Sequence, residues 1–256
     1  MRRSILMLVL LLMTLALSSC SEAFEWIVYD PDYLLLRDDY ENYQNKEVDD
    51  LDDLARFINR VTLETSRSNV MIEASVYDDE SLLERRRASG VVIRMDESST
   101  YVLTTLDLLE KEEGETLDLS VNDYLLREHS ASIEAQSEEQ RLALLRIKKS
   151  RRDALPVIDL AEERPRVGEQ VLLIGFQAQV INAINLGIVT DYRDDVRAGY
   201  ELMETDIPSD DYGLGGALID TNHDMVGILT LIVNDETATA YAVTLFGVKD
   251  FLSTVF

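Results

Sequence analysis

Few side chains in this sequence could carry out covalent chemistry. Hydrolysis by a nucleophile needs a serine or cysteine and a nearby base, most often histidine, that takes its proton. The chain has two histidines, His129 and His223, and one cysteine, Cys20. His129 falls on an expected strand and His223 in a polar hairpin, so we interpret both as surface residues. Ser209 has no obvious base and is expected in a turn.

Acidic side chains in the same hairpin could instead bind a cation. Asp220, Asn222 and Asp224 repeat the spacing that begins a calcium-binding EF-hand loop. Met225 stands where that loop needs glycine, and Leu231 stands where it needs glutamate. A β-turn explains the spacing better, so we predict no metal site and no cofactor.

The single cysteine fits lipid attachment. Two arginines at residues 2–3 precede an apolar stretch at residues 5–17, which is shorter than the roughly 20 residues that span a bilayer. The sequence LSSC at residues 17–20 resembles the lipobox of bacterial lipoproteins. This resemblance implies acylation of Cys20 and a lipid anchor. In such lipoproteins an aspartate after the cysteine often marks retention in the inner membrane, so Ser21 at this position favours the outer membrane or cell surface. The alternative is an ordinary cleaved signal peptide.

Composition restricts the partners of the chain. The net charge is −25 over 256 residues, and 46% of the residues are apolar, which is typical of a globular chain. We expect no nucleic-acid partner, because phosphate binding needs clustered lysine and arginine. An anionic bilayer would repel this surface, so membrane attachment must come from the N-terminus.

Two basic clusters interrupt the acidic chain. One is formed by residues 85–87, and the other by residues 148–152. We expect both clusters in solvated loops, and the alternative is docking to an acidic partner.

Hydrophobic periodicity predicts a short tether, one helix and then many strands. Residues 48–66 show helical spacing, and residues 246–256 predict a closing helix. The short apolar runs between them, bounded by polar turns, are typical of an all-β sandwich or a pair of barrels. The expected strands are residues 70–76, 91–94, 101–104, 117–121, 130–135, 142–147, 170–175, 184–190, 202–205, 217–220, 226–233 and 238–243.

Several short segments follow one another in a recognisable order. They are SGVVI (89–93), YVLTT (101–105), RLALLRI (141–147), RVGE (166–169), NLGIV (185–189), MVGI (225–228) and YAV (241–243). With METDIPSDDYGLGGALI at residues 203–219, they resemble trypsin-like serine proteases of the HtrA type. The resemblance covers about residues 50–256 and implies two six-stranded antiparallel barrels. The chain stops after the last helix, so we expect no PDZ domain.

The same resemblance places changed residues at the family's catalytic positions. The family's histidine corresponds to Asp107, its aspartate to Arg141 and its nucleophilic serine to Leu214. Tyr212 replaces a glycine whose backbone normally supplies an oxyanion donor. Leucine cannot attack a carbonyl, and aspartate with arginine cannot replace the histidine–aspartate pair. We therefore predict a pseudoprotease, not an enzyme.

The charges of two of these residues predict how they interact. Histidine and aspartate of the family face each other in one barrel, so the resemblance implies that Asp107 and Arg141 do so too. Their opposite signs predict a direct carboxylate–guanidinium contact. Leu214 is expected to cover this pair from across the cleft.

The sequence thus predicts three regions. Residues 1–19 are the lipoprotein signal peptide, residues 20–47 the tether, and residues 48–256 the trypsin-like domain. We expect a lipid-anchored protein of the bacterial cell envelope with a binding, scaffold or regulatory role, whose cleft takes a protein or peptide. The alternatives are a divergent active serine endopeptidase and a structural lipoprotein without a defined ligand, because fold alone does not decide function.

Overall fold

The computed structural model describes residues 60–61, 64–149, 155–177, 180–195, 200–208, 213–234 and 237–256. The expected signal peptide and tether lie outside these residues, as does most of the expected N-terminal helix. Of that helix, residues 60–61 are helical, and a 3-10 turn, η1, covers Thr65–Ser68. Within the described part of the chain, no helix is long and apolar enough to cross a membrane.

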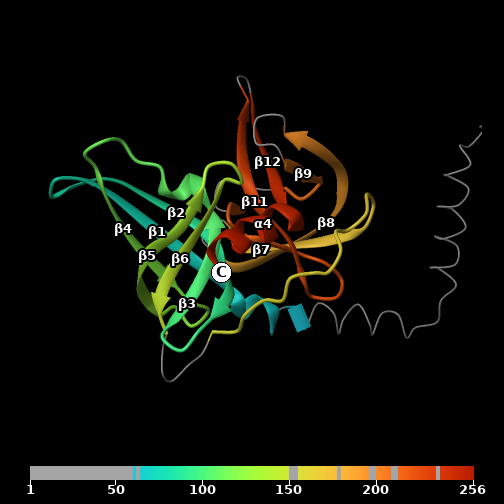
Figure 1. Ribbon diagram of the computed structural model, residues 1–256, viewed down its shortest axis with the longest axis horizontal. Coiled ribbons are helices and arrows are strands. Elements are labelled where there is room, and N and C mark those ends of the chain that lie inside the picture. The colour runs from blue at the N-terminus through green and yellow to red at the C-terminus, as the bar shows by residue number, and fades with distance from the viewer. Residues whose placement is uncertain are drawn as a thin grey trace, which may run out of the picture. The chain divides into compact units, whose positions relative to one another are not determined.

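The first half of the described chain forms a closed antiparallel barrel, which we call barrel one (Figure 1). Its strands lie in the order β1-β2-β3-β6-β5-β4, and β1 pairs with both β2 and β4 to close the sheet. A short 3-10 helix, η2 (Leu106–Leu109), follows β3. The strands are β1 (Asn69–Asp78), β2 (Ser81–Met95), β3 (Ser99–Thr105), β4 (Thr116–Asn122), β5 (Glu128–Ser137) and β6 (Leu142–Lys148).

The second half repeats this architecture as barrel two. Its strands lie in the order β10-β11-β12-β9-β8-β7, and β10 pairs with both β7 and β11. One α-helix, α4 (Leu245–Val255), follows the last strand. The strands are β7 (Gln170–Gln177), β8 (Val180–Asp195), β9 (Tyr200–Thr205), β10 (Ala217–Ile219), β11 (Met225–Asn234) and β12 (Thr237–Thr244).

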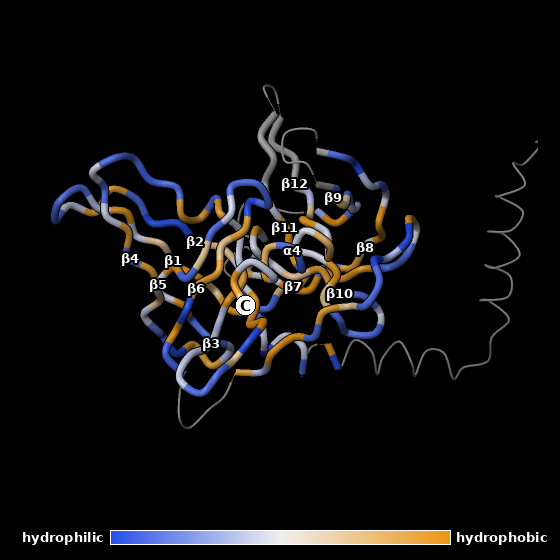
Figure 2. Tube along the Cα trace, viewed as in Figure 1, coloured by the Kyte–Doolittle hydropathy of each residue, from blue (hydrophilic) through white to orange (hydrophobic). Residues whose placement is uncertain are grey.

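Strand β6 shows why the apolar runs of the sequence become barrel strands. Side chains of a strand alternate between its two faces. Leu142 and Leu144 join an apolar cluster shared by the two barrels, whereas Ala143, Leu145 and Ile147 fill barrel one. Both faces of β6 are therefore buried over residues 142–145, where its sequence is entirely apolar. Figure 2 shows hydrophobic residues along the strands and hydrophilic residues in many of the connecting loops.

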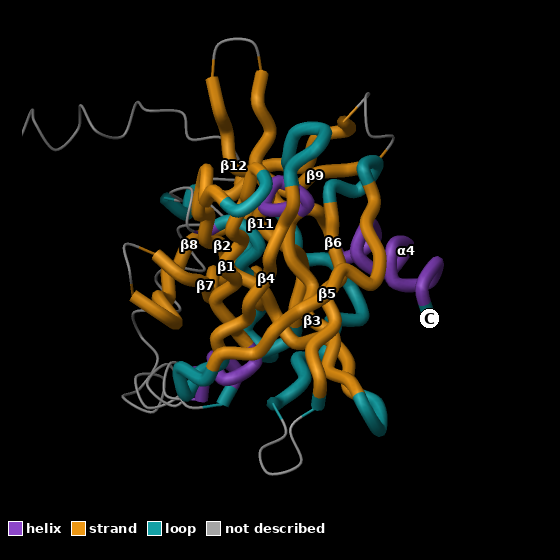
Figure 3. Tube along the Cα trace, turned by 90° about the vertical axis from the view of Figure 1, so that its left-hand side faces the viewer, coloured by secondary structure: helices purple, strands orange, loops and turns teal. Residues whose placement is uncertain are grey.

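Helix α4 packs beside the barrels, near β5 and β6 (Figure 3). Val248 and Phe251 are buried in the shared apolar cluster. Asp250 accepts a hydrogen bond of 3.0 Å from the side-chain amide of Gln140 in the turn before β6. Lys249 donates to the carbonyl of Ala161 at 2.6 Å. The helix is thus fixed by contacts to both halves of the described chain.

The predicted fold class, two six-stranded antiparallel barrels with a C-terminal helix, is confirmed. One local prediction was wrong, because Arg85, Arg86 and Arg87 lie within β2 and not in a loop. Glu73 on β1 pairs with Arg87 directly opposite it at 2.8 Å and with Arg85 at 3.1 Å. Cross-strand charge pairs of this kind favour a longer hairpin. Glu84 pairs with Arg86, so all three arginines have acidic partners.

The second basic cluster is only partly described. Lys148 ends β6, and Lys149 donates to the carbonyl of Asp96 at 2.8 Å. Residues 150–152 lie outside the described residues.

Candidate functional site

Strand pairing in barrel one brings Asp107 and Arg141 together. Thr105 at the end of β3 lies opposite Leu142 at the start of β6. The backbone N–H of Leu106 donates to the carbonyl of Arg141 at 2.8 Å. This hydrogen bond extends the β3–β6 pairing by one residue on each strand. Arg141 Nη2 donates to Asp107 Oδ1, so the predicted carboxylate–guanidinium contact is confirmed.

The second oxygen of Asp107 connects the two barrels. Asp107 Oδ2 accepts hydrogen bonds from Thr105 Oγ1 at 2.5 Å and from Thr230 Oγ1 at 3.2 Å. The two threonine hydroxyls also lie 3.2 Å apart. Thr105 belongs to β3 and Thr230 to β11 of barrel two, and both are buried. Sequence reasoning missed Thr230, because its role follows from the docking of the barrels and not from a local motif.

Two local features of Arg141 are energetically unfavourable. Its backbone φ is 53°, in the left-handed region that non-glycine residues seldom adopt. Its Nε is buried without a hydrogen-bond partner. Strained backbone of this type costs about 1–3 kcal/mol and persists only where surrounding contacts impose it. The contact with Asp107 is one such contact.

Leu214, which was expected to cover the Asp107–Arg141 pair, is 8% exposed and packs in the apolar core of barrel two. Its carbonyl accepts a hydrogen bond of 2.8 Å from the backbone N–H of Ser89 in β2. Gly215 follows with a φ of 77°, and a Cβ there would lie 2.2 Å from the Ser89 carbonyl oxygen. Only glycine fits so close to that strand.

Three other residues considered from the sequence lie outside the described residues. They are the lipidation candidate Cys20, the possible nucleophile Ser209 and the expected oxyanion position Tyr212.

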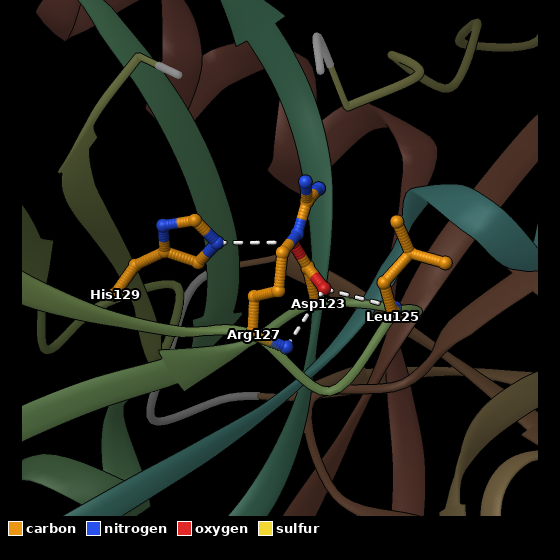
Figure 4. Close-up of polar contacts among 4 residues, drawn as sticks. All are labelled: Asp123, Leu125, Arg127 and His129. Carbon is orange, nitrogen blue, oxygen red and sulfur yellow. Dashed lines mark hydrogen bonds and ion pairs between the residues drawn. The ribbon is translucent and has the colours of Figure 1, made fainter. Parts of the chain in front are cut away.

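His129, predicted to be a surface residue, has a side chain that is 19% exposed and contacts a buried carboxylate. It lies on β5 as expected, but its Nε2 is 3.0 Å from Oδ2 of Asp123, whose side chain is fully buried (Figure 4). Arg127 Nε donates to the same oxygen at 2.8 Å. Asp123 Oδ1 accepts the backbone N–H groups of Leu125 at 2.8 Å and Arg127 at 3.1 Å. The carboxylate therefore organises the β4–β5 turn.

These contacts shift the pKa of Asp123. Burial by itself raises the pKa of this carboxyl, because the charged form loses water. Hydrogen bonds from His129, Arg127 and the Leu125 amide favour the charged form and together outweigh burial, so the pKa lies below its ordinary value. The sequence shows Asp123 and His129 at a distance of six residues, but no motif reveals that they meet.

His223 and the acidic hairpin around it form a closed turn, as predicted. Asp220 Oδ1 accepts the backbone N–H groups of Asn222 at 2.8 Å and Asp224 at 3.0 Å. His223, predicted to be a surface residue, has a φ of 76° and is partly buried in this turn. Burial, followed by the charge of Arg60, holds the pKa of His223 below its ordinary value. In the described ranges, no three acidic, histidine or cysteine side chains group as metal ligands.

Comparisons with known proteins agree with this architecture. A family model described as a trypsin-like peptidase domain matches residues 88–228. Among solved structures, the chain is similar to an HtrA-type protease, AlgW, solved with a tripeptide, with a TM-score of 0.63 and 21% sequence identity. The alignment covers 78% of this chain and 63% of that one. At this identity the likeness shows the fold alone. No curated protein sequence matches the chain.

The Asp107–Arg141 contact is expected to contribute measurably to stability. Asp107 is 14% exposed and Arg141 is 32% exposed, so the pair lies between surface pairs and buried pairs. A double-mutant cycle with Asp107→Asn and Arg141→Gln should give a coupling free energy of about 1–3 kcal/mol in urea unfolding. The control is the more exposed pair Arg146–Glu134 of the same barrel, for which we expect about 0–1 kcal/mol. Equal coupling in both cycles would contradict this assignment.

The Asp123 cluster should make barrel one sensitive to acid. Because the pKa of Asp123 is lowered on folding, its stabilisation is present above the unfolded pKa and is lost as pH falls through the folded pKa. Asp123→Asn should lower the free energy of unfolding by about 3 kcal/mol at pH 7. This difference should shrink below about pH 4. Asp118→Asn on β4, where the carboxylate is exposed, is the control and should change stability by less than about 0.5 kcal/mol. A pH-independent loss would refute the electrostatic explanation.

Proposed function

The chain belongs to the family of trypsin-like peptidase domains, and we propose that it is a member that binds other molecules without cleaving them. The observation that carries this proposal is the contact between Asp107 and Arg141. The family resemblance assigns these two positions to the histidine and aspartate of the catalytic triad. An aspartate–arginine ion pair in their place supplies no proton relay.

The hydrogen bonds of Asp107 support this proposal. A general base must reach the proton of the nucleophile directly or through one water. Both oxygens of Asp107 already accept hydrogen bonds, one from Arg141 and the other from Thr105 and Thr230. Arginine stays protonated at any physiological pH and cannot act as a base. The pair therefore fits a structural role better than a catalytic one.

The position of Leu214 supports it as well. The triad mechanism needs a nucleophile that projects toward the substrate carbonyl. The side chain at position 214 is apolar and lies in the core of barrel two. A buried leucine at this position has no group that could attack a substrate carbonyl, which supports a role in binding without cleavage.

The N-terminal sequence adds a location to the proposal. The apolar stretch and the LSSC sequence at residues 17–20 favour a lipoprotein of the bacterial cell envelope, attached through lipid at Cys20. In this arrangement the barrels would act as a lipid-anchored scaffold, adaptor or regulator with a protein or peptide partner.

The absence of hydrolysis is directly testable. The purified domain should neither degrade unfolded casein nor label with a fluorophosphonate probe, under conditions in which an active trypsin does both. Ser209→Ala should behave identically, because Ser209 has no assigned role. Cleavage that persists through repurification, or labelling that Ser209→Ala abolishes, would establish a divergent active endopeptidase and refute the proposal.

Lipid attachment is tested separately in intact bacteria. The full chain should incorporate a labelled fatty acid and partition into detergent, because acyl chains anchor it. Cys20→Ser should abolish the label and either release the protein or leave its precursor uncleaved. Ser18→Ala, two residues earlier, keeps a small residue and should leave both properties unchanged. A Cys20→Ser protein that is processed and still bound to the membrane would show that another element anchors the chain.

A further inference from the structure

A groove of about 1100 Å³ lies at one end of barrel one, between η2, the loop at residues 110–115 and strands β4 and β5. We call it the acidic groove. It lies beside the Asp107–Arg141 pair, since Arg141 is one of its lining residues. All of its lining residues lie in the described part of the chain.

The floor of the acidic groove is apolar and continuous with the core of barrel one. Leu109 belongs to that core, and Leu106 and Leu117 pack against it. Ile133 on β5 also lines the groove, yet its side chain is 44% exposed. The pairing of β5 with β6 shifts register between Ile133 and Ala135, so Ile133 stands next to a bulge. Bulges often redirect side chains near binding sites.

The rim of the groove carries a strong excess of negative charge. Its two cations are Arg141, which already pairs with Asp107, and Lys111, which donates to the Glu115 carbonyl at 2.7 Å. The excess of acids over bases makes the groove complementary to a cationic partner. Its acidic side chains are Glu110, Glu112, Glu113, Glu115 and Glu138.

Local hydrogen bonds hold the acidic loop in place. The Glu115 carboxylate accepts the backbone N–H of Glu112 at 2.8 Å. Arg86 of β2 donates to the Glu110 carbonyl at 2.5 Å and pairs with Glu84. These contacts fix the loop while leaving the outer glutamates free to meet a partner. A surface that is ordered before binding loses less conformational entropy when a partner docks.

We propose that the acidic groove binds a protein segment in which lysine or arginine residues flank an apolar side chain. The apolar side chain would cover Ile133 and the leucines of the floor, and the cations would face the glutamates of the rim. Nucleic acid and anionic lipid headgroups do not fit, because both carry the same charge as the rim. This inference rests on the proposed binding function and specifies the chemistry of the partner.

The test uses the purified full chain and a fluorescent peptide of alternating lysine and leucine. Fluorescence anisotropy should show saturable binding that weakens as salt rises, since exposed charge pairs are screened. A peptide of alternating glutamate and leucine should not bind. A peptide of alternating lysine and glycine should bind much more weakly, because it leaves the apolar floor uncovered.

Matched variants separate the groove from the overall charge of the chain. Glu113→Gln with Glu138→Gln should weaken binding about tenfold at low salt, at about threefold for each lost pair. The control is Glu128→Gln with Glu139→Gln, two exposed glutamates that do not line the groove. Ile133→Ser should also weaken binding, whereas Leu186→Ser, at a site 56% exposed in barrel two, should not.

The outcomes distinguish this inference from the proposed function. Equal weakening by groove and control variants would mean that the peptide responds only to net charge, and the groove would be rejected. Absence of binding would also reject the groove but leave the non-catalytic function intact. Mass spectrometry of the recovered peptide shows whether the protein cleaves it. Cleavage would contradict the proposed function. The comparison of groove and control variants would still show whether the peptide binds in the acidic groove.

Discussion

The Asp107 carboxylate accepts donors from three parts of the molecule that are distant in sequence. Arg141 comes from the turn before β6, Thr105 from β3 and Thr230 from barrel two. Both barrels and α4 also share an apolar cluster. Asp107 is 14% exposed, and a largely buried carboxylate is stable only if its oxygens have partners, because an unpaired buried charge is costly. All three donors must therefore reach Asp107 at the same time. This condition restricts the relative position of the barrels, the backbone of Arg141 and the end of β3.

Much of the fold could be predicted from the sequence, because its strands are apolar runs separated by polar turns. The twelve expected strands correspond to β1–β12, although β2 and β8 extend well beyond the predicted segments. Much of the extra length is charged or polar, and part of it is supported by cross-strand partners such as Glu73 opposite Arg87. Local hydrophobicity cannot reveal such partners. The Asp107–Arg141 contact was predicted through the family resemblance and the opposite charges of the two residues, and the pairing of β3 with β6 brings them together.

Other features of the candidate site could not be predicted, because they depend on tertiary structure. The contact of Thr230 with Asp107 requires the two barrels to dock. The close approach of Gly215 to Ser89 of β2 also requires the two barrels to dock. Asp123 and His129 meet because β4 and β5 pair across a short turn. In each case the residue types were visible in the sequence, but their neighbours were not.

The opposite charges of Asp107 and Arg141 have an evolutionary consequence. Replacing Arg141 alone by aspartate would bring two carboxylates face to face, and replacing Asp107 alone by histidine would bring an imidazole against a guanidinium. Each intermediate disfavours the charged form of one partner and loses the attraction that holds the present pair. Conversion of the present pair into a histidine–aspartate pair by single substitutions must therefore pass through a less stable sequence. The ion pair is thus a barrier between this sequence and one with a histidine–aspartate pair at these two positions.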